Sequence, residues 1–414
     1  MKLLTLFVLC VLTFARAQDT IPGFALHDGD RVVFYGDSIT QNGGYTRLVE
    51  AYARSRFQAW DLRFYNAGVG GDTTKGGGAG EVGLRLERDV ISLKPTVVTI
   101  MLGMNDGGYG KLAPATLAGF TERLRAMVVK LQGALPGVRI YLIRTSPFDD
   151  IARAPEFNPG YNETLRQLGE AVTAIGREQK LGVIDFGQAV NDGIRAVAKD
   201  NRELARQILP DRVHPSPSGH LIMGATLLRA WHAPALVARV QLDAQTGKLV
   251  ATERTQISAL SAAPGKIEWS ELDEALPLPL NWTDADTELA QMAGARLESL
   301  DEEPLVITGL PAGRYEVRID DSSIGTFTAV DLAGGVNLAL LSTPMRWQAY
   351  PVRWGAENGQ EVQRIRRGLQ FAAGNEASLS AAAEVLAGRD ESDQRARSLG
   401  IKPKPRHYQV ILVP

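Results

Sequence analysis

The stretch RVVFYGDSIT, residues 31–40, decides how this sequence folds. Its apolar run predicts a short buried strand that ends at Gly36, and Ser38 follows almost at once. Ligands and chemistry gather at the carboxyl ends of strands in open α/β sheets, so this position makes Ser38 a candidate nucleophile. Serines in such loops more often turn or cap the chain, and the assignment therefore depends on partners elsewhere in the sequence.

Residues 30–232 alternate between strand-like and helix-like segments. Apolar residues recur every three or four positions over 117–131 and 161–175, which predicts amphipathic helices, and a last helix is expected from Ser218, as its N-cap, to Trp231. Short runs rich in Val, Ile, Phe or Tyr predict strands at Arg31–Tyr35, Asp61–Asn66, Pro95–Leu102, Val138–Thr145 and Gly182–Phe186. This alternation predicts an α/β domain with a parallel sheet that helices cover on both faces.

The character of the sequence changes after about residue 235. Periodic runs are few over 243–287, and residues 356–398 have a mostly helical pattern. Short strand-like pieces occur at Leu305–Thr308, Gly313–Asp320, Thr326–Leu332 and Tyr408–Val413. With 414 residues, two domains are the default. We therefore expect one domain over 18–235 and a smaller C-terminal accessory region of β-hairpins and helix over 236–414.

The N-terminus has the pattern of a signal peptide. Lys2 precedes a short apolar stretch, and Ala15-Arg16-Ala17 matches a cleavage site, so cleavage is expected after Ala17 and residues 1–17 would be lost. An uncleaved anchor is the alternative, but the stretch is too short to span a bilayer. We expect a secreted or periplasmic protein without stable membrane insertion. The single cysteine, Cys10, lies in this segment, which leaves the mature chain no disulfide or thiolate.

His214 is the best candidate for a base that would activate Ser38. It lies in the proline-rich loop 209–219, three residues after Asp211, and this spacing lets the carboxylate reach Nδ1 and leaves Nε2 free for the serine. A histidine taken singly is more often structural. The other four of the five histidines lack such a setting and are His27, His220, His232 and His407.

Two loops after predicted strands could supply donors for an oxyanion. Gly71 follows the second strand, where glycine lets a backbone N–H approach a substrate, and Asn105 follows the third strand with a side-chain amide. A tight turn is the alternative role for Gly71, and a cap or Asx-turn is the alternative for Asn105.

Four blocks together resemble the SGNH hydrolases of the GDSL esterase/lipase superfamily: Gly36-Asp37-Ser38, the Gly71 block, Gly103-x-Asn105-Asp106 and Asp211-x-x-His214. The resemblance covers residues 30–232, and the region after 235 is not part of it. It implies a flavodoxin-like three-layer sandwich. It also implies a catalytic triad of Ser38 as nucleophile, His214 as base and Asp211 as its orienting group, with an oxyanion hole from Ser38, Gly71 and Asn105.

Several other functions lack their sequence signals. The glycine-rich stretch 68–83 has no G-K-[ST] ending, and there is no H-E-x-x-H motif and no G-x-S-x-G elbow. Lys and Arg number 45 against 47 Asp and Glu, a formal net charge of −2, which gives no basic field for nucleic acid. We therefore expect no cofactor, no metal and no nucleic-acid partner.

The sequence thus predicts an exported serine esterase that hydrolyses O-acyl esters. The favoured substrate is an acetylated saccharide, as for a carbohydrate O-acetylesterase, or another small acyl ester. Alternatives are a lipase or thioesterase with the same triad, and a non-catalytic carbohydrate-binding surface protein.

Tryptophans can stack on sugars, although buried or boundary positions are commoner for them. Those of the C-terminal region are Trp269, Trp282, Trp347 and Trp354.

Overall fold

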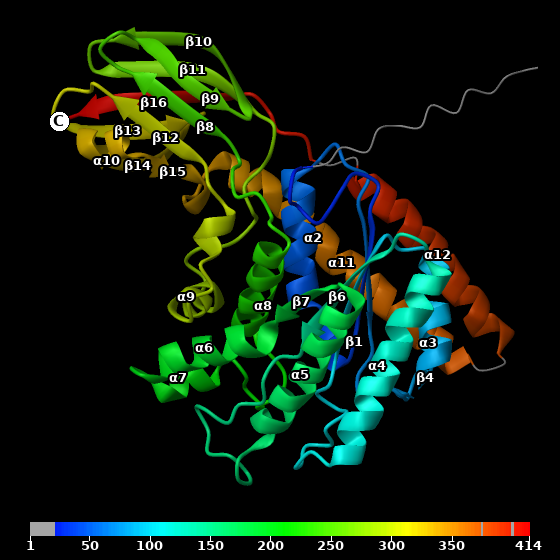
Figure 1. Cartoon of the computed structure of the whole chain (residues 1–414). Helices are drawn as coiled ribbons and strands as arrows, with labels where there is room; N and C mark the ends of the chain where they lie inside the picture. Colours follow the sequence, from blue (N-terminus) through cyan, green and yellow to red (C-terminus); the bar gives the residue numbers. More distant parts are fainter. Residues whose placement is uncertain (1–20, 374–375, 399–400) are drawn as a thin grey trace, which may run out of the picture.

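The computed structural model describes residues 21–373, 376–398 and 401–414, so the predicted signal peptide lies outside the described residues and stays a prediction (Figure 1). A five-stranded parallel sheet confirms the predicted α/β fold. When its five strands are numbered by their order in the chain, they lie side by side in the order 2-1-3-4-5, which is the flavodoxin-like order. The strands are β2 (Arg63–Gly68), β1 (Arg31–Gly36), β5 (Val97–Leu102), β6 (Arg139–Arg144) and β7 (Gly182–Asp185).

Helices cover both faces of this sheet. Contacts group α2, α6 and α8 on one face and α3, α4 and α5 on the other. The helices are α1 (Ser38–Asn42), α2 (Gly44–Arg56), α3 (Val82–Asp89), α4 (Pro114–Ala134), α5 (Tyr161–Gln179), α6 (Phe186–Ala198), α7 (Arg202–Arg206) and α8 (Pro217–Ala230). The predicted N-cap of the last helix was wrong, because Ser216 and not Ser218 accepts the cap bond, from the N–H of Gly219. A small hairpin joins β3 (Gly76–Gly77) and β4 (Gly80–Glu81).

The C-terminal region is rich in strands, and antiparallel pairs predominate. One sheet has the order β10-β11-β16-β13-β14, and a second has the order β15-β12-β8-β9. These strands are β8 (Arg239–Asp243), β9 (Lys248–Glu253), β10 (Thr255–Ala263), β11 (Lys266–Asp273), β12 (Pro304–Thr308), β13 (Arg314–Ile319), β14 (Ser322–Thr328), β15 (Val336–Asn337) and β16 (Arg406–Val413). Sequence reasoning missed β9 to β11, of which β9 and β10 are largely exposed, and it extended one strand over what is α10 (Ala329–Gly334).

Two long helices leave this region and return to the first domain: α11 (Pro344–Ala373) and α12 (Ala377–Ser398). Figure 1 shows α11 crossing behind α2, after which α12 leads back toward the final strand β16. The short helix α9 (Ala285–Met292) also packs with the first domain, and Leu289 belongs to its hydrophobic core. The domain boundary near residue 235 stays a prediction. Residues beyond it help to complete the hydrophobic core around the parallel sheet. Within the described ranges, no helix is long and apolar enough to cross a membrane.

Side-chain amides from these two helices cover the free edge of β2. Phe64 donates its N–H to Gln394 at 2.9 Å, and its carbonyl accepts from Gln363 at 2.9 Å and from Gln394 at 2.6 Å. Asn66 donates its N–H to Gln363 at 2.9 Å, and Arg367 bonds to its carbonyl. Unpaired strand edges invite association with other chains, and here two glutamines and an arginine satisfy the edge in place of a sixth strand.

Gln360 attaches α11 to α2 as well. Its Oε1 accepts from the hydroxyl of Thr46 at 2.7 Å, and its Nε2 donates to Glu50 at 3.2 Å. Because Gln360 and Gln363 are both buried, α11 is held firmly beside the start of α2 and the end of β2. The C-terminal region therefore contributes a fixed helix close to the loop that carries Ser38.

Candidate active site

The register of the parallel sheet brings three loops together. Gly36 at the end of β1 pairs with Gly68 of β2 on one side and with Met101 of β5 on the other. Ser38, Gly71 and Asn105 follow these positions within a few residues. The three candidate residues therefore leave the sheet at the same level, on its carboxyl edge.

Ser38 lies at the start of a hydrogen-bonded chain of three side chains. Its Oγ is 2.9 Å from Nε2 of His214, and Nδ1 of that ring is 2.6 Å from Oδ2 of Asp211. The other carboxylate oxygen, Oδ1, accepts the backbone N–H of Val213 at 2.9 Å and of His214 at 2.7 Å. The loop thus fixes the carboxylate, which in turn orients the imidazole toward the serine. This is the arrangement that the D-x-x-H spacing predicted.

Electrostatics keep Asp211 ionised. Partial burial acts to raise its pKa, but the N–H of His214, the imidazole and the N–H of Val213 together outweigh burial and leave the pKa below its usual value. His220 behaves in the opposite way. It is fully buried, and burial lowers its pKa to about 3, so it stays neutral and accepts the N–H of Tyr45 at 3.3 Å. Among the described histidines, His214 is the one that contacts Ser38.

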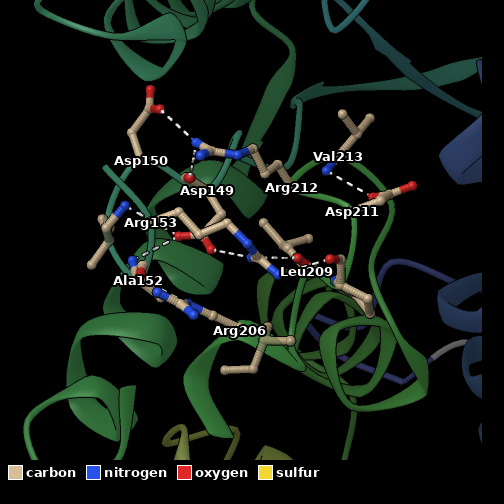
Figure 2. Close-up of polar contacts among 12 residues, drawn as sticks. Asp149, Asp150, Ala152, Arg153, Arg206, Leu209, Asp211, Arg212 and Val213 are labelled. Carbon is tan, nitrogen blue, oxygen red and sulfur yellow. Dashed lines mark hydrogen bonds and ion pairs between the residues drawn. The ribbon is translucent and has the colours of Figure 1, made fainter. Parts of the chain in front are cut away.

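A buried network holds the loop that carries Asp211 and His214 (Figure 2). Arg153 donates to the carboxylate of the fully buried Asp149 at 2.5 Å and to the carbonyls of Leu209 at 3.0 Å and Pro210 at 2.7 Å. These carbonyls immediately precede Asp211. The network therefore joins the loop after β6 to the residues that set the position of the triad carboxylate.

Arg212 completes this connection between the two loops. Its carbonyl accepts the N–H of Asp149 at 2.9 Å, and its guanidinium donates to the carbonyls of Asp149 at 3.2 Å and Ala154 at 3.0 Å. The backbone of Arg212 has φ 75°, a left-handed conformation that costs a non-glycine residue energy. Hydrogen bonds on both sides of Arg212 hold this turn, which separates Asp211 from His214 along the chain.

Unbonded backbone N–H groups lie in the described loops that carry Ser38 and Gly71. The backbone N–H groups of Ser38 and Gly71 have no partner among the described residues. Gly71 has φ +76°, a conformation that favours glycine, while the adjacent Gly70 N–H donates to Oε1 of Gln41 at 2.7 Å. A Cβ built on Gly70 would lie 3.9 Å from Cβ of Ser38, so this loop borders the serine directly.

Two hydrogen bonds fix the orientation of the Asn105 amide. Nδ2 donates to the carbonyl of Asp72 at 3.0 Å, and Oδ1 accepts the hydroxyl of Tyr109 at 3.0 Å. An amide nitrogen carries two hydrogens, so one remains for a further acceptor. The carboxylate of the next residue, Asp106, accepts both the N–H (2.9 Å) and the hydroxyl (2.5 Å) of Thr74. The loops after β2 and β5 are thus bonded to each other.

Close packing beneath the serine demands small residues. A Cβ built on Gly68 would lie 2.3 Å from the backbone nitrogen of Gln41, so α1 rests directly on the end of β2. Asp37 is fully buried and caps α1 by accepting the N–H of Ile39 at 2.9 Å. Burial raises the pKa of Asp37 to about 7, with Asp106 adding to the effect and the Ile39 N–H opposing it.

Within the described residues, no group of three or more His, Cys, Asp or Glu could hold a metal ion.

Sequence reasoning missed the residues that support this site. Asp149 lies five residues after the end of β6, and an aspartate in the loop after a strand with an arginine four residues on was a usable signal. Tyr109, four residues after Asn105, was a second such signal. Nothing in the sequence pattern placed α11 of the C-terminal region beside Ser38.

Comparison with known proteins agrees with this architecture. Residues 34–222 match the GDSL-like Lipase/Acylhydrolase family. An acetylxylan esterase of Geobacillus stearothermophilus is 27% identical over 222 residues, covering 49% of this chain and 93% of the esterase. Esterase TesA of Pseudomonas aeruginosa is 28% identical over 190 residues, covering 42% of this chain and 84% of TesA.

A solved structure of BT4096, a gut microbial diltiazem-metabolizing enzyme, is similar over both parts of the chain. Its TM-score is 0.79 at 25% identity, and the match covers 93% of this chain and 98% of that one. The chain contains a region, residues 34–222, that belongs to the GDSL-like lipase/acylhydrolase (SGNH) family. It is a hydrolase that acts on carboxylic esters, and the acetylxylan esterase and TesA are its distant relatives.

Replacing Arg153 with Met should lower kcat for ester hydrolysis by about ten- to a hundredfold with little change in KM, because the triad carboxylate loses its support and small displacements are costly. Arg206→Met is the matched control, since Arg206 donates to the carbonyl of Ala152 at 3.2 Å in the same network but does not touch the carbonyls before Asp211. Steady-state kinetics well below the melting temperature would test this. Equal kcat values for the two variants would contradict a positioning role for Arg153.

The buried Asp37 predicts a pH dependence of stability. Since its pKa rises from 3.8 to about 7 on folding, the folded state binds the proton more tightly, and the free energy of unfolding falls as pH rises between these values. Asp37→Asn keeps the cap acceptor and removes the titration. Its free energy of unfolding relative to the parent protein should therefore increase with pH over this range in urea titrations.

Asp331→Asn provides a control of opposite sign for that titration. Hydrogen bonds from Thr328 lower the pKa of Asp331, so this carboxylate contributes stability at neutral pH that is lost toward acid. The stability of Asp331→Asn relative to the parent protein should fall as pH rises toward 3.8 and change little between 3.8 and 7, where the Asp37 difference appears. Parallel pH profiles for the parent protein and Asp37→Asn would show that the buried carboxyl does not titrate as described.

Proposed function

We propose that this protein is an esterase that removes short acyl groups, acetyl in the first place, from hydroxyl groups of carbohydrates. Ser38 is the nucleophile, His214 the general base and Asp211 the group that orients the imidazole. The observation that carries the chemistry is the continuous chain from Ser38 Oγ through the imidazole to the Asp211 carboxylate, at 2.9 and 2.6 Å.

The reaction proceeds through an acyl-enzyme. Ser38 Oγ attacks the ester carbonyl while Nε2 of His214 takes its proton, and the imidazolium is stabilised by Asp211. The negative oxygen of the tetrahedral intermediate accepts from the N–H groups of Ser38 and Gly71 and from the amide of Asn105. The intermediate collapses, His214 protonates the leaving alcohol, and water activated by the same base hydrolyses the acyl-enzyme to the free acid.

The cavity beside Ser38 supports a hydroxyl-rich substrate. It has a volume of about 380 Å³. Apart from Ser38 itself, all of the side chains that line it are amides or charged groups. Four of these come from α11 of the C-terminal region. The lining side chains are Gln41, Asn42, Arg47, Glu357, Gln360, Glu361 and Arg364. Such a wall offers hydrogen bonds to sugar hydroxyls, and it would leave a long alkyl chain in contact with unsatisfied polar groups.

An adjoining cavity favours a second candidate, an esterase for longer acyl chains. This space of about 360 Å³ shares Asn42, Arg47 and Glu357 with the first. Much of its lining is apolar, from Leu48, Ala51, Pro215, Pro217, Leu221, Leu278, Pro279 and Leu280. It does not include Ser38, so an acyl chain would have to pass the polar residues that the two cavities share.

We also propose that the enzyme acts outside the cytoplasm. The signal-like pattern of residues 1–17 supports this, and N-terminal sequencing of the protein from its natural host tests it, since a start at Gln18 agrees with export and a start at Met1 contradicts it.

Kinetics on a graded series of esters would test the substrate class. The expected order of kcat/KM is p-nitrophenyl acetate above butyrate above octanoate, with acetate released from acetylated xylo-oligosaccharides. Ser38→Ala should lower every rate at least about a thousandfold, because the nucleophile is lost.

A preference for octanoate would support the second candidate instead. Hydrolysis that survives Ser38→Ala unchanged would contradict the proposed mechanism for every ester tested.

A further inference from the structure

Three aromatic side chains form a row on α11, in which the two tryptophans are exposed and Tyr350 is half-buried. Trp347 and Trp354 are 58% and 57% exposed, and Tyr350 lies between them. The four tryptophans of the C-terminal region therefore differ, because Trp269 is fully buried and Trp282 donates its Nε1–H to the carbonyl of Ala339. Exposing two indole rings forgoes burial that would stabilise the protein, which indicates that they contact something else.

The row is ordered by contacts between its own rings. The rings of Trp347 and Tyr350 stack with centroids 5.0 Å apart at 22°, and those of Tyr350 and Trp354 are 6.2 Å apart at 48°. At 3.6 residues per turn, the three positions fall within about 60° of each other around the helix. They therefore form a strip of flat faces along one side of α11, which we call the aromatic strip (residues 347, 350 and 354).

The same helix leads from the aromatic strip to Ser38. Arg353 and Glu357 line the adjoining cavity, and one turn later Glu361 and Arg364 line the cavity that contains Ser38. At 1.5 Å per residue, Trp347 and Arg364 are about 26 Å apart along the axis. A monosaccharide is far shorter than this, but a chain of several sugars can contact both ends.

We propose that α11 binds the polysaccharide chain that carries the ester, with the aromatic strip stacking on sugar rings several units away from the acyl group removed at Ser38. This inference rests on the proposed function. The apolar faces of sugar rings fit the aromatic strip, and their hydroxyls fit the charged and amide side chains that follow along α11. A stable protein partner would need a much larger interface than three rings provide.

Binding along α11 also assigns a role to the C-terminal region. The triad and the oxyanion donors all lie within residues 38–214, whereas the aromatic strip and much of the cavity wall come from beyond residue 344. Gln360 and Gln363 are buried and hold α11 against the first domain, so the strip keeps a fixed position relative to Ser38. The first domain supplies the chemistry, and α11 selects polymeric over small esters.

The double variant Trp347→Ala/Trp354→Ala in the full chain tests this proposal. KM for acetylated xylan should rise about tenfold, the loss expected for one or two aromatic contacts, while kcat/KM for p-nitrophenyl acetate stays within about twofold. Trp347→Phe/Trp354→Phe keeps the ring faces and should recover most of the loss. Val330→Ala, a change at an 80% exposed position in the β-rich part, is the matched control and should leave both substrates unaffected.

Equal losses on both substrates, or no loss on xylan, would overturn the proposal. So would a dimer of the parent protein, seen by light scattering, that the double variant disrupts, because the aromatic strip would then be an interface between copies. Ser38→Ala should bind xylan in affinity electrophoresis, and the triple variant with both tryptophans replaced should not. This arm reports on the aromatic strip even if the parent protein hydrolyses no ester, in which case the proposed function fails separately.

Discussion

The parallel pairing of β1 between β2 and β5 is the constraint on which the rest of the site depends. Gly36 is held in register with Gly68 and Met101, so the loops that follow all three strands begin at the same level. The serine, the glycine-rich loop and the asparagine loop need no long-range adjustment to meet. Hydrogen bonds from Asn105 to Asp72 and from Thr74 to Asp106 then lock the loops together. His214 lies on a loop more distant in the sequence, and Asp149 and Arg153 hold the residues that precede this loop's Asp211.

The C-terminal region is integrated with the catalytic domain rather than appended to it. Gln363 and Gln394 bond to the edge of β2 where another strand would otherwise pair, and Leu289 of α9 packs into the first core. α11 thus has two functions in one helix. Its inner face completes the first domain, and its outer face forms part of the wall beside Ser38. If the proposed function holds, this arrangement separates the serine that reacts from the side chains that select the substrate.

The sequence predicted the sheet well because each strand of the first domain is a short apolar run bounded by turn residues, and the observed strands lie within two residues of the expected bounds. It also named Asp211 and His214, which are close in sequence and form a hydrogen-bonded chain with Ser38, while the roles of Gly71 and Asn105 stay predictions. It failed where contacts are long-range. The strands β9 and β10 carry little periodic burial, and the contact of Gln360 with Thr46 spans more than three hundred residues.

The most direct test of the central claim, that His214 activates Ser38, is covalent labelling with an organophosphorus ester followed by peptide mass spectrometry. The account predicts one adduct, on the peptide containing Ser38, that is absent in Ser38→Ala and forms far more slowly in His214→Ala. An adduct on another residue, or labelling of Ser38 at an unchanged rate in His214→Ala, would contradict it.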